Sequence, residues 1–247
     1  MSQPYLTIVI PAYNEAACLD RTLDEVRAEL DAIGQPWDLV VVDDGSTDRT
    51  ASIVEAQAAV DPRIRVVREP HRGKGAAVRC GMLEASGEWR FLADADLSMP
   101  IREIRRFLPG DDGPRADILI GSREAEGSER LAEPEYRHAF GRLFNLAVKW
   151  LVVGGIDDTQ CGYKIFTAAA ADMLFSCQRL DGFGFDAEIL FLARRADLSI
   201  HEVPITWTYR ERTSVTTLSG GGAFLDLLRV RWNQLCGRYP PAVRVRP

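Results

Sequence analysis

The first half of the chain alternates short apolar runs with segments of helical periodicity, and this alternation restricts the possible folds more than any other feature. The apolar runs occupy residues 6–10, 37–42, 64–67 and 89–93. After the first run, Leu19, Leu23, Val26 and Leu30 recur at helical spacing, and two further helices are expected, one around residues 53–58 and one over residues 75–85. Near-continuous apolar strands separated by helices are typical of a parallel sheet that helices cover on both faces.

Short polar side chains mark where the first two helices are expected to begin. Asn14 is the candidate N-cap of the first helix, and Thr47 or Asp48 is the candidate for the second. Side-chain oxygens at such positions accept hydrogen bonds from the unpaired N–H groups of the first helical turn.

The second half of the chain is less regular. A strand is expected over residues 118–120, followed by a charged, mobile loop over residues 123–135. Helices are expected over residues 140–153, 168–175 and 187–194, a strand over 200–209, and an amphipathic helix over 223–235 with Phe224, Leu227, Leu228 and Trp232 on one side. Because no repeat or low-complexity linker interrupts the chain, residues 1–247 are predicted to form a single domain.

Three polar clusters follow strands of the predicted sheet. They are Pro11–Glu15, Asp43–Ser46 and Asp94–Asp96, each placed where an apolar run ends. In open α/β sheets, ligands bind outside the carboxyl ends of the strands. The three clusters are therefore expected to converge on one crevice.

Asp94-Ala95-Asp96 is the strongest candidate for a metal site. Carboxylate oxygens suit Mg²⁺ or Mn²⁺, which usually binds one or two protein carboxylates together with substrate phosphates. Alternation along an extended segment points the two side chains to opposite sides, so only one of them needs to bind the metal directly. Asp is common in turns, and it is the position at a strand end that favours the metal-binding interpretation.

Asp43 and Asp44 lie in a turn-forming sequence, and their carboxylates are candidate acceptors for a base or a ribose. The Arg72–Gly75 segment precedes a helix without the spacing of a P-loop. Glycines before a helix N-terminus still allow backbone N–H groups to approach phosphate, and Lys74 is expected to neutralise a diphosphate.

Two further motifs, at residues 157–162 and 183–188, place polar groups among aromatic residues, which indicates a lined pocket. Asp186 and Glu188 are both candidates for a general base or for orienting an acceptor, and helix capping is the structural alternative for both. Cys161 is interpreted as pocket lining. The three histidines lack metal-ligand spacing.

Composition excludes several other classes. The net charge of −6 argues against general nucleic-acid binding, which relies on a basic surface. No run of about 18 apolar residues predicts a membrane-spanning helix, and the first residues lack a secretory signal, so a cytoplasmic location is expected. The five cysteines are scattered without a C-x-x-C pair, which predicts neither disulfides nor a zinc site.

Taken together, the motifs resemble those of the family 2 glycosyltransferases. The matching segments are residues 9–15, 41–48 and 94–96, in the family's order and spacing, and the similarity runs from about residue 6 to residue 209. This resemblance implies a GT-A fold, which is a Rossmann-like, mostly parallel sheet flanked by helices. It also implies that residues 6–122 bind a nucleotide sugar and residues 123–218 form the acceptor side, before a C-terminal helix and tail at 219–247.

The same resemblance assigns roles to individual residues. Pro11, Tyr13, Glu15 and Asp44 would hold the nucleoside, with Asp43, Lys74 and Gln160 also on the donor side; Asp94 would meet the donor and Asp96 the metal. Arg123, with Arg137 or Arg142, would contact phosphates of the acceptor or product. The divalent ion would be Mg²⁺ or Mn²⁺.

Within the family, residues 72–75, 94–98, 121–123 and 158–164 look most like those of the dolichyl-phosphate β-glucosyltransferases and related polyprenyl-phosphate hexosyltransferases. The implied reaction is an inverting transfer of glucose from UDP-glucose to a polyprenyl or dolichyl phosphate. The alternatives are another donor such as GDP-mannose, a polysaccharide acceptor, or an inactive nucleotide-sugar binding module.

Two features bear on the lipid acceptor. Relatives carry a Gly-Ser-Lys stretch after the last strand where this chain has Arg212-Thr213-Ser214, so Arg210 or Arg212 would have to supply that basic contact. The C-terminal helix combines Leu and Trp residues with Arg229, Arg231 and Arg238. That composition suits peripheral contact with a bilayer surface, and an ordinary helix packed on the domain is the alternative.

Overall fold

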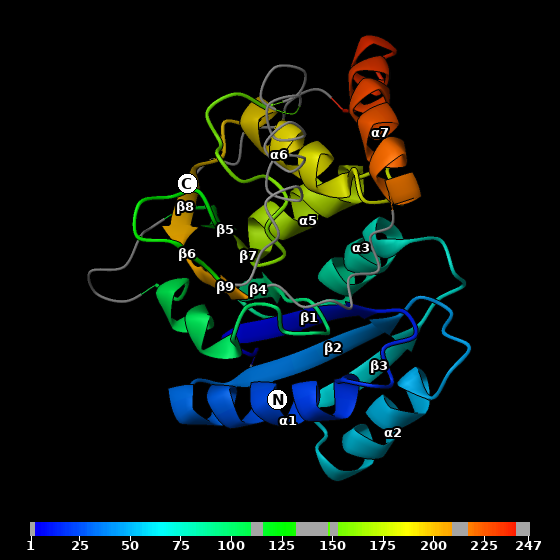
Figure 1. The fold of residues 1–247 in the computed structure, drawn as a ribbon, viewed down its shortest axis with the longest axis vertical. Coiled ribbons are helices and arrows are strands. Elements are labelled where there is room, and N and C mark those ends of the chain that lie inside the picture. Colours follow the sequence, from blue (N-terminus) through cyan, green and yellow to red (C-terminus); the bar gives the residue numbers. More distant parts are fainter. Residues whose placement is uncertain (1–2, 110–115, 132–147, 149–152, 209–216, 241–247) are drawn as a thin grey trace.

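The apolar runs of the sequence form the strands of a central sheet. A computed structural model describes residues 3–109, 116–131, 148, 153–208 and 217–240 of the chain (Figure 1). The strands are β1 (Leu6–Ala12), β2 (Trp37–Asp43), β3 (Ile64–Arg68), β4 (Trp89–Leu92), β5 (Ile118–Ser122), β6 (Glu129–Leu131), β7 (Lys164–Thr167), β8 (Ile200–Pro204) and β9 (Thr206–Thr208). The helices are α1 (Leu19–Ile33), α2 (Thr50–Val60), α3 (Lys74–Glu84), α5 (Ala168–Cys177), α6 (Phe185–Arg195) and α7 (Thr217–Leu235), with a 3₁₀ helix at Ile101–Arg106.

The main sheet has seven strands in the order β3-β2-β1-β4-β7-β5-β8. The β1–β2, β1–β4, β2–β3 and β5–β8 pairs are parallel, and β7 alone runs antiparallel to its neighbours β4 and β5. The predicted mostly parallel α/β sheet is therefore confirmed. The antiparallel β7 is a feature that the apolar pattern did not reveal, because buried parallel and antiparallel strands have similar composition.

Helices cover both faces of this sheet (Figure 1). On one face, α1 and α2 pack with the 3₁₀ helix, and the predicted stripe of Leu19, Leu23, Val26 and Leu30 is buried there. On the other face, α3 packs on β1 and β2, and α5 and α6 follow it. Successive residues of β1 serve different layers, since Ile8 and Ile10 join the first core and Val9 the second.

The predicted capping residues do not cap their helices. Helix α1 begins at Leu19, and Asn14 instead adopts a left-handed backbone with φ 56°, where its Oδ1 accepts a hydrogen bond from the N–H of Thr47 at 2.9 Å. Arg49 is the N-cap position of α2, although Oδ1 of Asp48 accepts from the N–H of Thr50 at 2.9 Å. Asn tolerates left-handed geometry, so Asn14 links two strand-end loops rather than starting a helix.

The late elements also differ from expectation. The strand expected over residues 200–209 is divided into β8, which joins the main sheet, and β9, which pairs with β6 in a separate two-stranded sheet. Strand β6 therefore lies inside the segment 123–135, which was expected to be a loop and of which the structure describes residues 123–131. The helix expected over residues 140–153 lies almost wholly outside the described residues. Helix α7 begins at Thr217 rather than at residue 223.

Within the part of the chain that the structure describes, no helix is both long enough and apolar enough to cross a bilayer.

Candidate active site

The three polar clusters meet at the carboxyl ends of β1, β2 and β4. Ala12 and Asp43 are directly paired at the ends of β1 and β2, and the N–H of Asp44 donates to the carbonyl of Ala12 at 2.9 Å. Burial raises the pKa of Glu15, and the negative charges of Asp96 and Asp94 raise it further. This electrostatic coupling places the acidic side chains of two strand ends in one site, as the sheet topology predicts.

Asp94 forms an ion pair with Lys74 across the site. Nζ of Lys74 lies 2.7 Å from Oδ1 of Asp94, and each side chain is about a quarter exposed, at 27% and 26%. Burial opposes ionisation of Asp94, but the positive charge and hydrogen bond of Lys74 hold its pKa below the ordinary value. The charges of Lys164 and Arg123 act in the same direction, so three cations surround this carboxylate.

Asp96 belongs to a tight turn with different partners. Its carboxylate accepts hydrogen bonds from the backbone N–H of Ser98 at 2.9 Å and from the Ser98 hydroxyl at 2.8 Å. Leu97 has φ 46°, in the left-handed region that non-glycine residues rarely adopt. The buried Thr22 hydroxyl donates to the carbonyl of Ala95 at 2.6 Å. These contacts fix the turn, and they separate the surroundings of Asp96 from those of Asp94.

Asp43 and Asp44 shape the loops at the carboxyl end of β2. Oδ1 of Asp43 accepts from the N–H of Ser46, and the two carboxylate oxygens of Asp44 accept from the N–H groups of Arg72 and Gly73 at 2.9 Å. Both acids thus bind backbone in this structure, and their direct contact with a nucleoside stays a prediction.

Tyr13 offers the aromatic surface of this region. Its ring stacks on His71 with centroids 4.0 Å apart and an interplanar angle of 18°, and its side chain is 42% exposed. Nδ1 of His71 lies 2.9 Å from Oδ2 of Asp44, which holds the imidazole ring in place. Gly45 permits this packing, because it has φ 71° and a Cβ there would lie 2.7 Å from the backbone nitrogen of His71.

Arg123 and Asp158 form the second ion pair of the site. The guanidinium donates from Nε at 2.6 Å and from one terminal nitrogen at 2.8 Å, which gives the bidentate geometry of a strong charge-assisted pair. Asp158 is fully buried, and although burial opposes ionisation, Arg123 keeps its pKa below the ordinary value. Nearby, Nε2 of Gln160 is a buried donor with no hydrogen-bond acceptor among the described residues.

Asp186 forms the third ion pair, with Lys164. Nζ of Lys164 lies 2.6 Å from Oδ1 of Asp186, and the lysine side chain is only 1% exposed. Burial raises the pKa of Asp186 despite the opposing charges of Lys164 and Lys74. The structural alternative for Asp186, capping of a helix, is not what the structure shows, because Gly184 is the N-cap position of α6 and Asp186 binds a lysine from β7.

Glu188 does not join this cluster. Its carboxylate accepts hydrogen bonds from the N–H groups of Arg179 and Leu180 and from the Tyr239 hydroxyl at 2.6 Å. It is fully buried, and burial raises its pKa. In this structure Glu188 accepts from loop backbone and from Tyr239 near the C-terminus, and its role as a general base stays a prediction. Of the two acidic candidates, Asp186 is the one near Asp94 and Lys74.

Several contributors were not recognised as site residues from sequence. Lys164 is the clearest example, and the sequence contained a signal for it. A lysine precedes the apolar residues Ile165 and Phe166 of a short strand, and a buried lysine there requires a counter-charge. Thr22 and Ser98 gave no comparable signal, because a hydroxyl inside a helix or a turn has many ordinary roles. Arg137, Arg142, Arg210 and Arg212 lie outside the described residues.

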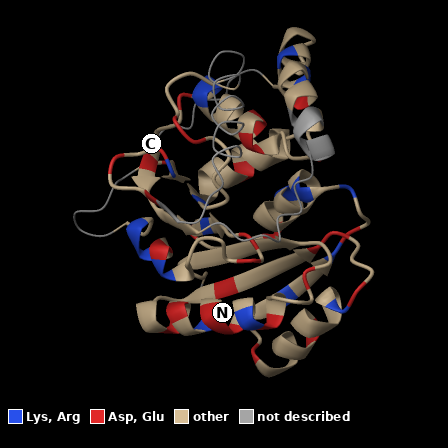
Figure 2. Cartoon of the chain, in the orientation of Figure 1, with Lys and Arg blue, Asp and Glu red and all other residues tan. Residues whose placement is uncertain are grey.

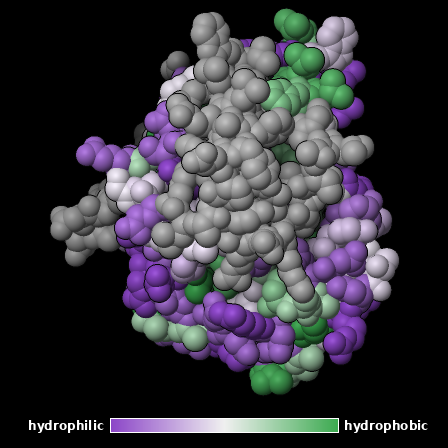
Figure 3. Space-filling view, in the orientation of Figure 1, coloured by the Kyte–Doolittle hydropathy of each residue, from purple (hydrophilic) through white to green (hydrophobic). Residues whose placement is uncertain are grey.

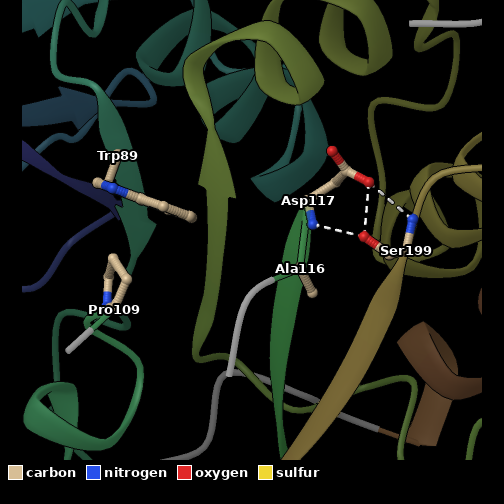
Figure 4. Close-up of a pocket in the computed structure, with 5 residues that line it drawn as sticks. All are labelled: Trp89, Pro109, Ala116, Asp117 and Ser199. Atoms are coloured by element: carbon tan, nitrogen blue, oxygen red, sulfur yellow. Dashed lines mark hydrogen bonds between the residues drawn. The ribbon is translucent and has the colours of Figure 1, made fainter. Parts of the chain in front are cut away.

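A pocket of about 390 Å³ lies away from these residues (Figure 4). Its lining residues are Trp89, Pro109, Ala116, Asp117 and Ser199. Trp89, Asp117 and Ser199 stand at or just before the first residues of β4, β5 and β8, so the pocket is at the amino ends of these parallel strands. Asp117 and Ser199 hydrogen-bond one another there, and the lining contains no cluster of catalytic groups.

Comparison with known proteins decides the family. The family model described as glycosyl transferase family 2 matches residues 7–174, which include the strand-end clusters and the 158–162 segment. The chain belongs to glycosyl transferase family 2. Dolichyl-phosphate beta-glucosyltransferase ALG5C of Trichomonas vaginalis is 38% identical over 83% of this chain and 64% of its own length. The human dolichyl-phosphate beta-glucosyltransferase is 32% identical over 95% of this chain and 77% of its own length.

Comparison with solved structures confirms the predicted GT-A fold. Glucosyl-3-phosphoglycerate synthase from Mycobacterium tuberculosis, in complex with Mn²⁺, UDP-glucose and phosphoglyceric acid, matches with a TM-score of 0.67. The match covers 97% of this chain and 82% of that protein at 19% sequence identity, so it bears on the fold alone.

The residues of this family 2 chain fit a divalent ion that is shared with substrate. No group of three or more His, Cys, Asp or Glu side chains in the described residues is arranged to hold a metal by itself. Asp94 already has the counter-charge of Lys74, whereas Asp96 forms no ion pair with any described Lys or Arg. One carboxylate without an ion-pair partner among the described residues is a donor that Mg²⁺ accepts when substrate phosphate and water oxygens complete its shell.

Proposed function

We propose that this chain is an inverting glycosyltransferase that moves glucose from UDP-glucose to a polyprenyl or dolichyl phosphate. The observation that carries the proposal is the set of three ion pairs, Lys74–Asp94, Arg123–Asp158 and Lys164–Asp186, whose cations all act on Asp94. Three cations at one strand end suit a reaction that brings a diphosphate and a second phosphate together. The names of the relatives, dolichyl-phosphate beta-glucosyltransferases, support the same donor sugar and acceptor class.

The donor side would consist of the β1, β2 and β4 ends. Tyr13 presents an aromatic face for the base, and Glu15, Asp43 and Asp44 border the nucleoside with Pro11. Lys74 neutralises diphosphate charge, and Asp94 holds Lys74 and meets the sugar. Asp96 is the residue that would hold Mg²⁺ or Mn²⁺. When bound, the divalent ion supplies Lewis-acid stabilisation of the departing diphosphate.

The acceptor side would be formed by the Arg123–Asp158 and Lys164–Asp186 pairs, with Gln160 between them in sequence. A phosphate oxygen is already anionic and needs no strong general base to attack the anomeric carbon in line. Arg123 and Lys164 then act by orienting the phosphate and offsetting its charge. Nε2 of Gln160 is buried and has no acceptor within the described part of the chain, which makes it a donor suited to a substrate oxygen.

A hydroxyl acceptor, as in a polysaccharide, is the second candidate, and the raised pKa of Asp186 favours it. A carboxylate with such a pKa is suited to accept the proton of an attacking hydroxyl. Asp186→Asn separates the two possibilities. With a phosphate acceptor the variant keeps most of its kcat, whereas with a hydroxyl acceptor it loses roughly a hundredfold or more.

The test of the proposal is a donor screen with a water-soluble, short-chain polyprenyl phosphate. UDP-glucose and GDP-mannose are each offered with Mg²⁺ or Mn²⁺, and released nucleotide and glycolipid are measured. We expect turnover with UDP-glucose only in the presence of the divalent ion. GDP-mannose turnover would change the donor, and absence of turnover with any donor and acceptor would favour an inactive binding module.

Because a long-chain polyprenyl phosphate resides in a bilayer, we further propose that the protein works peripherally, at the cytoplasmic face of a membrane.

A further inference from the structure

The C-terminal helix exposes a continuous apolar stripe. Among the described residues, seven large hydrophobic side chains are exposed, and four of them lie on α7. These four are Leu225, Leu228, Trp232 and Leu235, with exposures of 57%, 55%, 60% and 80%. Their spacing of three, four and three residues places them on one face of the helix. We call these four residues the α7 stripe.

The opposite face of α7 packs on the domain. Leu227 and Val230 are fully buried in the core that α6 also lines, and Arg231 lies over the ring of Phe191 from α6. The helix is therefore seated by one apolar face while the α7 stripe points outward. Figure 3 shows the hydrophobic residues gathered over this helix at the upper right of the view. An outward apolar face of this length is typical of a docking surface.

The sequence predicts that Phe224, Leu227, Leu228 and Trp232 lie on one side of the C-terminal helix. The structure divides them, because Leu227 is buried and Phe224 is partly buried, whereas Leu228 and Trp232 are exposed. One face of the helix thus packs on the domain, as the alternative of an ordinary packed helix predicts, and the other face is uncovered among the described residues. Contact of that face with a bilayer stays a prediction.

Charge beside the α7 stripe selects the kind of partner. Arg229 has a side chain that is 67% exposed, and Arg231 and Arg238 are exposed as well. The acidic residue of the helix, Asp226, is buried and forms an ion pair with Arg229 at 2.8 Å. The stripe therefore has a basic border on a chain whose net charge is −6 (Figure 2). Anionic lipid headgroups complement this arrangement, and Leu and Trp suit the boundary beneath them.

We propose that the α7 stripe docks in the interface of a bilayer that contains anionic lipids, with α7 lying along the membrane plane. This inference rests on the proposed lipid-phosphate acceptor and names the surface that brings the enzyme to it. Helix α7 is connected to the acceptor side, since Oδ2 of Asp226 accepts from the N–H of Gly184, two residues before Asp186. Docking through the stripe thus puts the bilayer beside the elements that carry Asp186.

Binding to vesicles tests the proposal without turnover. The full chain is floated with phosphatidylcholine vesicles, with and without phosphatidylserine, and tryptophan emission is recorded. We expect flotation with the anionic vesicles and a blue shift that Trp232→Ala removes. Leu228→Glu/Leu235→Glu should weaken binding on the order of tenfold or more, because two leucines no longer enter the interface. Arg229→Gln should reduce the preference for anionic vesicles.

Val60→Glu is the matched control. Val60 is 80% exposed, like Leu235, and lies on α2 outside the stripe, so the variant should bind vesicles as the unaltered chain does. The substituted leucines are exposed, and unchanged melting temperatures would verify that each variant is folded. Vesicle binding that is absent in the unaltered chain, or unchanged in Leu228→Glu/Leu235→Glu, would overturn the proposal. A dimer that this double variant dissociates, without vesicle binding, would identify a second copy as the occupant and also overturn it.

Activity measurements keep this proposal separate from the proposed function. The double variant should retain turnover with a water-soluble, short-chain polyprenyl phosphate and lose it with a long-chain acceptor embedded in vesicles. Vesicle binding without any transferase activity would leave the docking surface standing while the proposed function fails. Transferase activity without vesicle binding would leave the proposed function standing while the docking proposal fails.

Discussion

At the scale of single residues, the site is an arrangement of compensated charges. Asp94, Asp158 and Asp186 each form an ion pair with a lysine or an arginine, whereas Asp96 forms none among the described residues. A buried charge is tolerated only when it is paired and hydrogen-bonded. Of the two carboxylates after β4, Asp96 is therefore the one whose charge is available to an added cation.

Asp96→Asn is expected to remove metal-dependent turnover while the fold survives. The amide can still accept from Ser98 but provides no charge for a divalent ion, so kcat should fall roughly a hundredfold or more. Nucleotide release measured across a Mn²⁺ titration checks this, with Asp24→Asn on the exposed side of α1 as the control. Full turnover in Asp96→Asn would move the metal to another residue.

Lys164→Met is expected to destabilise the protein through the charge that it leaves behind. Removing one partner of a buried ion pair costs roughly 3 kcal/mol or more, because the Asp186 carboxylate then loses the cation that is hydrogen-bonded to it. Lys164→Met/Asp186→Asn should recover part of that loss. A double-mutant cycle from urea unfolding measures the coupling, and strictly additive losses would contradict the buried pair.

At the scale of secondary-structure elements, loops from distant parts of the chain hold one another in position around the site. The segment before β7 packs directly on the carboxylate after β4. A Cβ on Gly162 would lie 1.9 Å from Oδ2 of Asp94, so no other residue type fits without displacing that side chain. The antiparallel insertion of β7 beside β4 creates this close approach.

Gly162→Ala is expected to lower turnover far more than it lowers stability. The added methyl group pushes the Asp94 carboxylate away from Lys74, and misplacement by about 1 Å can cost a hundredfold in rate. Gly222→Ala is the matched control, since a Cβ there meets nothing within 4 Å. Initial rates and thermal melts of both variants check the prediction, and equal rates would show that Asp94 tolerates the displacement.

The Arg123–Asp158 pair joins the end of β5 to the segment before β7, and its contribution depends on pH. The native pKa of Asp158 lies below the unfolded value of about 3.9. The stabilisation is therefore fully present above that value and is lost as pH falls through the native pKa.

Comparison of the unaltered chain with Asp158→Asn measures this effect. The difference in free energy of unfolding should be largest near neutral pH and should shrink below about pH 4. Carboxylates common to both proteins cancel in the difference. A difference that stays constant down to about pH 3 would show that the charge of Asp158 contributes nothing.

At the scale of the whole molecule, the two halves of the main sheet carry different groups of site residues. Its β3-β2-β1-β4 half carries the clusters that we propose bind the donor, and its β7-β5-β8 half carries Lys164 and Arg123, which we propose meet the acceptor; α7 adds an outward apolar face. A ligand that bridges the two halves of the sheet binds the folded state and not the unfolded state, so it should stabilise the whole domain.

UDP with Mn²⁺ is expected to raise the melting temperature more than UDP alone. At a hundred times the dissociation constant, a ligand adds about 2.7 kcal/mol, which corresponds to roughly 5–10 °C for a chain of this size. A chelator should reverse the Mn²⁺ increment, and Asp96→Asn should lack it. An increment that persists in this variant would place the ion elsewhere.

Much of the fold and part of the site could be predicted from sequence because local pattern carries that information. Apolar runs and helical spacing predicted the parallel strands, and the order of the clusters placed Asp44 and Asp94 at one sheet edge. The N-cap expected at Asn14 was wrong, because its amide found a partner 33 residues away in Thr47. Local propensity cannot anticipate such a contact.

The sequence by itself determined the elements of this protein, the sheet edge that carries its acidic clusters, and its family. Only the tertiary structure decided which charges pair, since Lys164 reaches Asp186 across 22 residues and Arg123 reaches Asp158 across 35. It also separated the roles of Asp186 and Glu188, and of the two faces of α7. The physical reason is burial. Helical and strand periodicity is a local property of the sequence, whereas the free-energy cost of an unpaired charge or an exposed leucine depends on which residues the fold brings next to it.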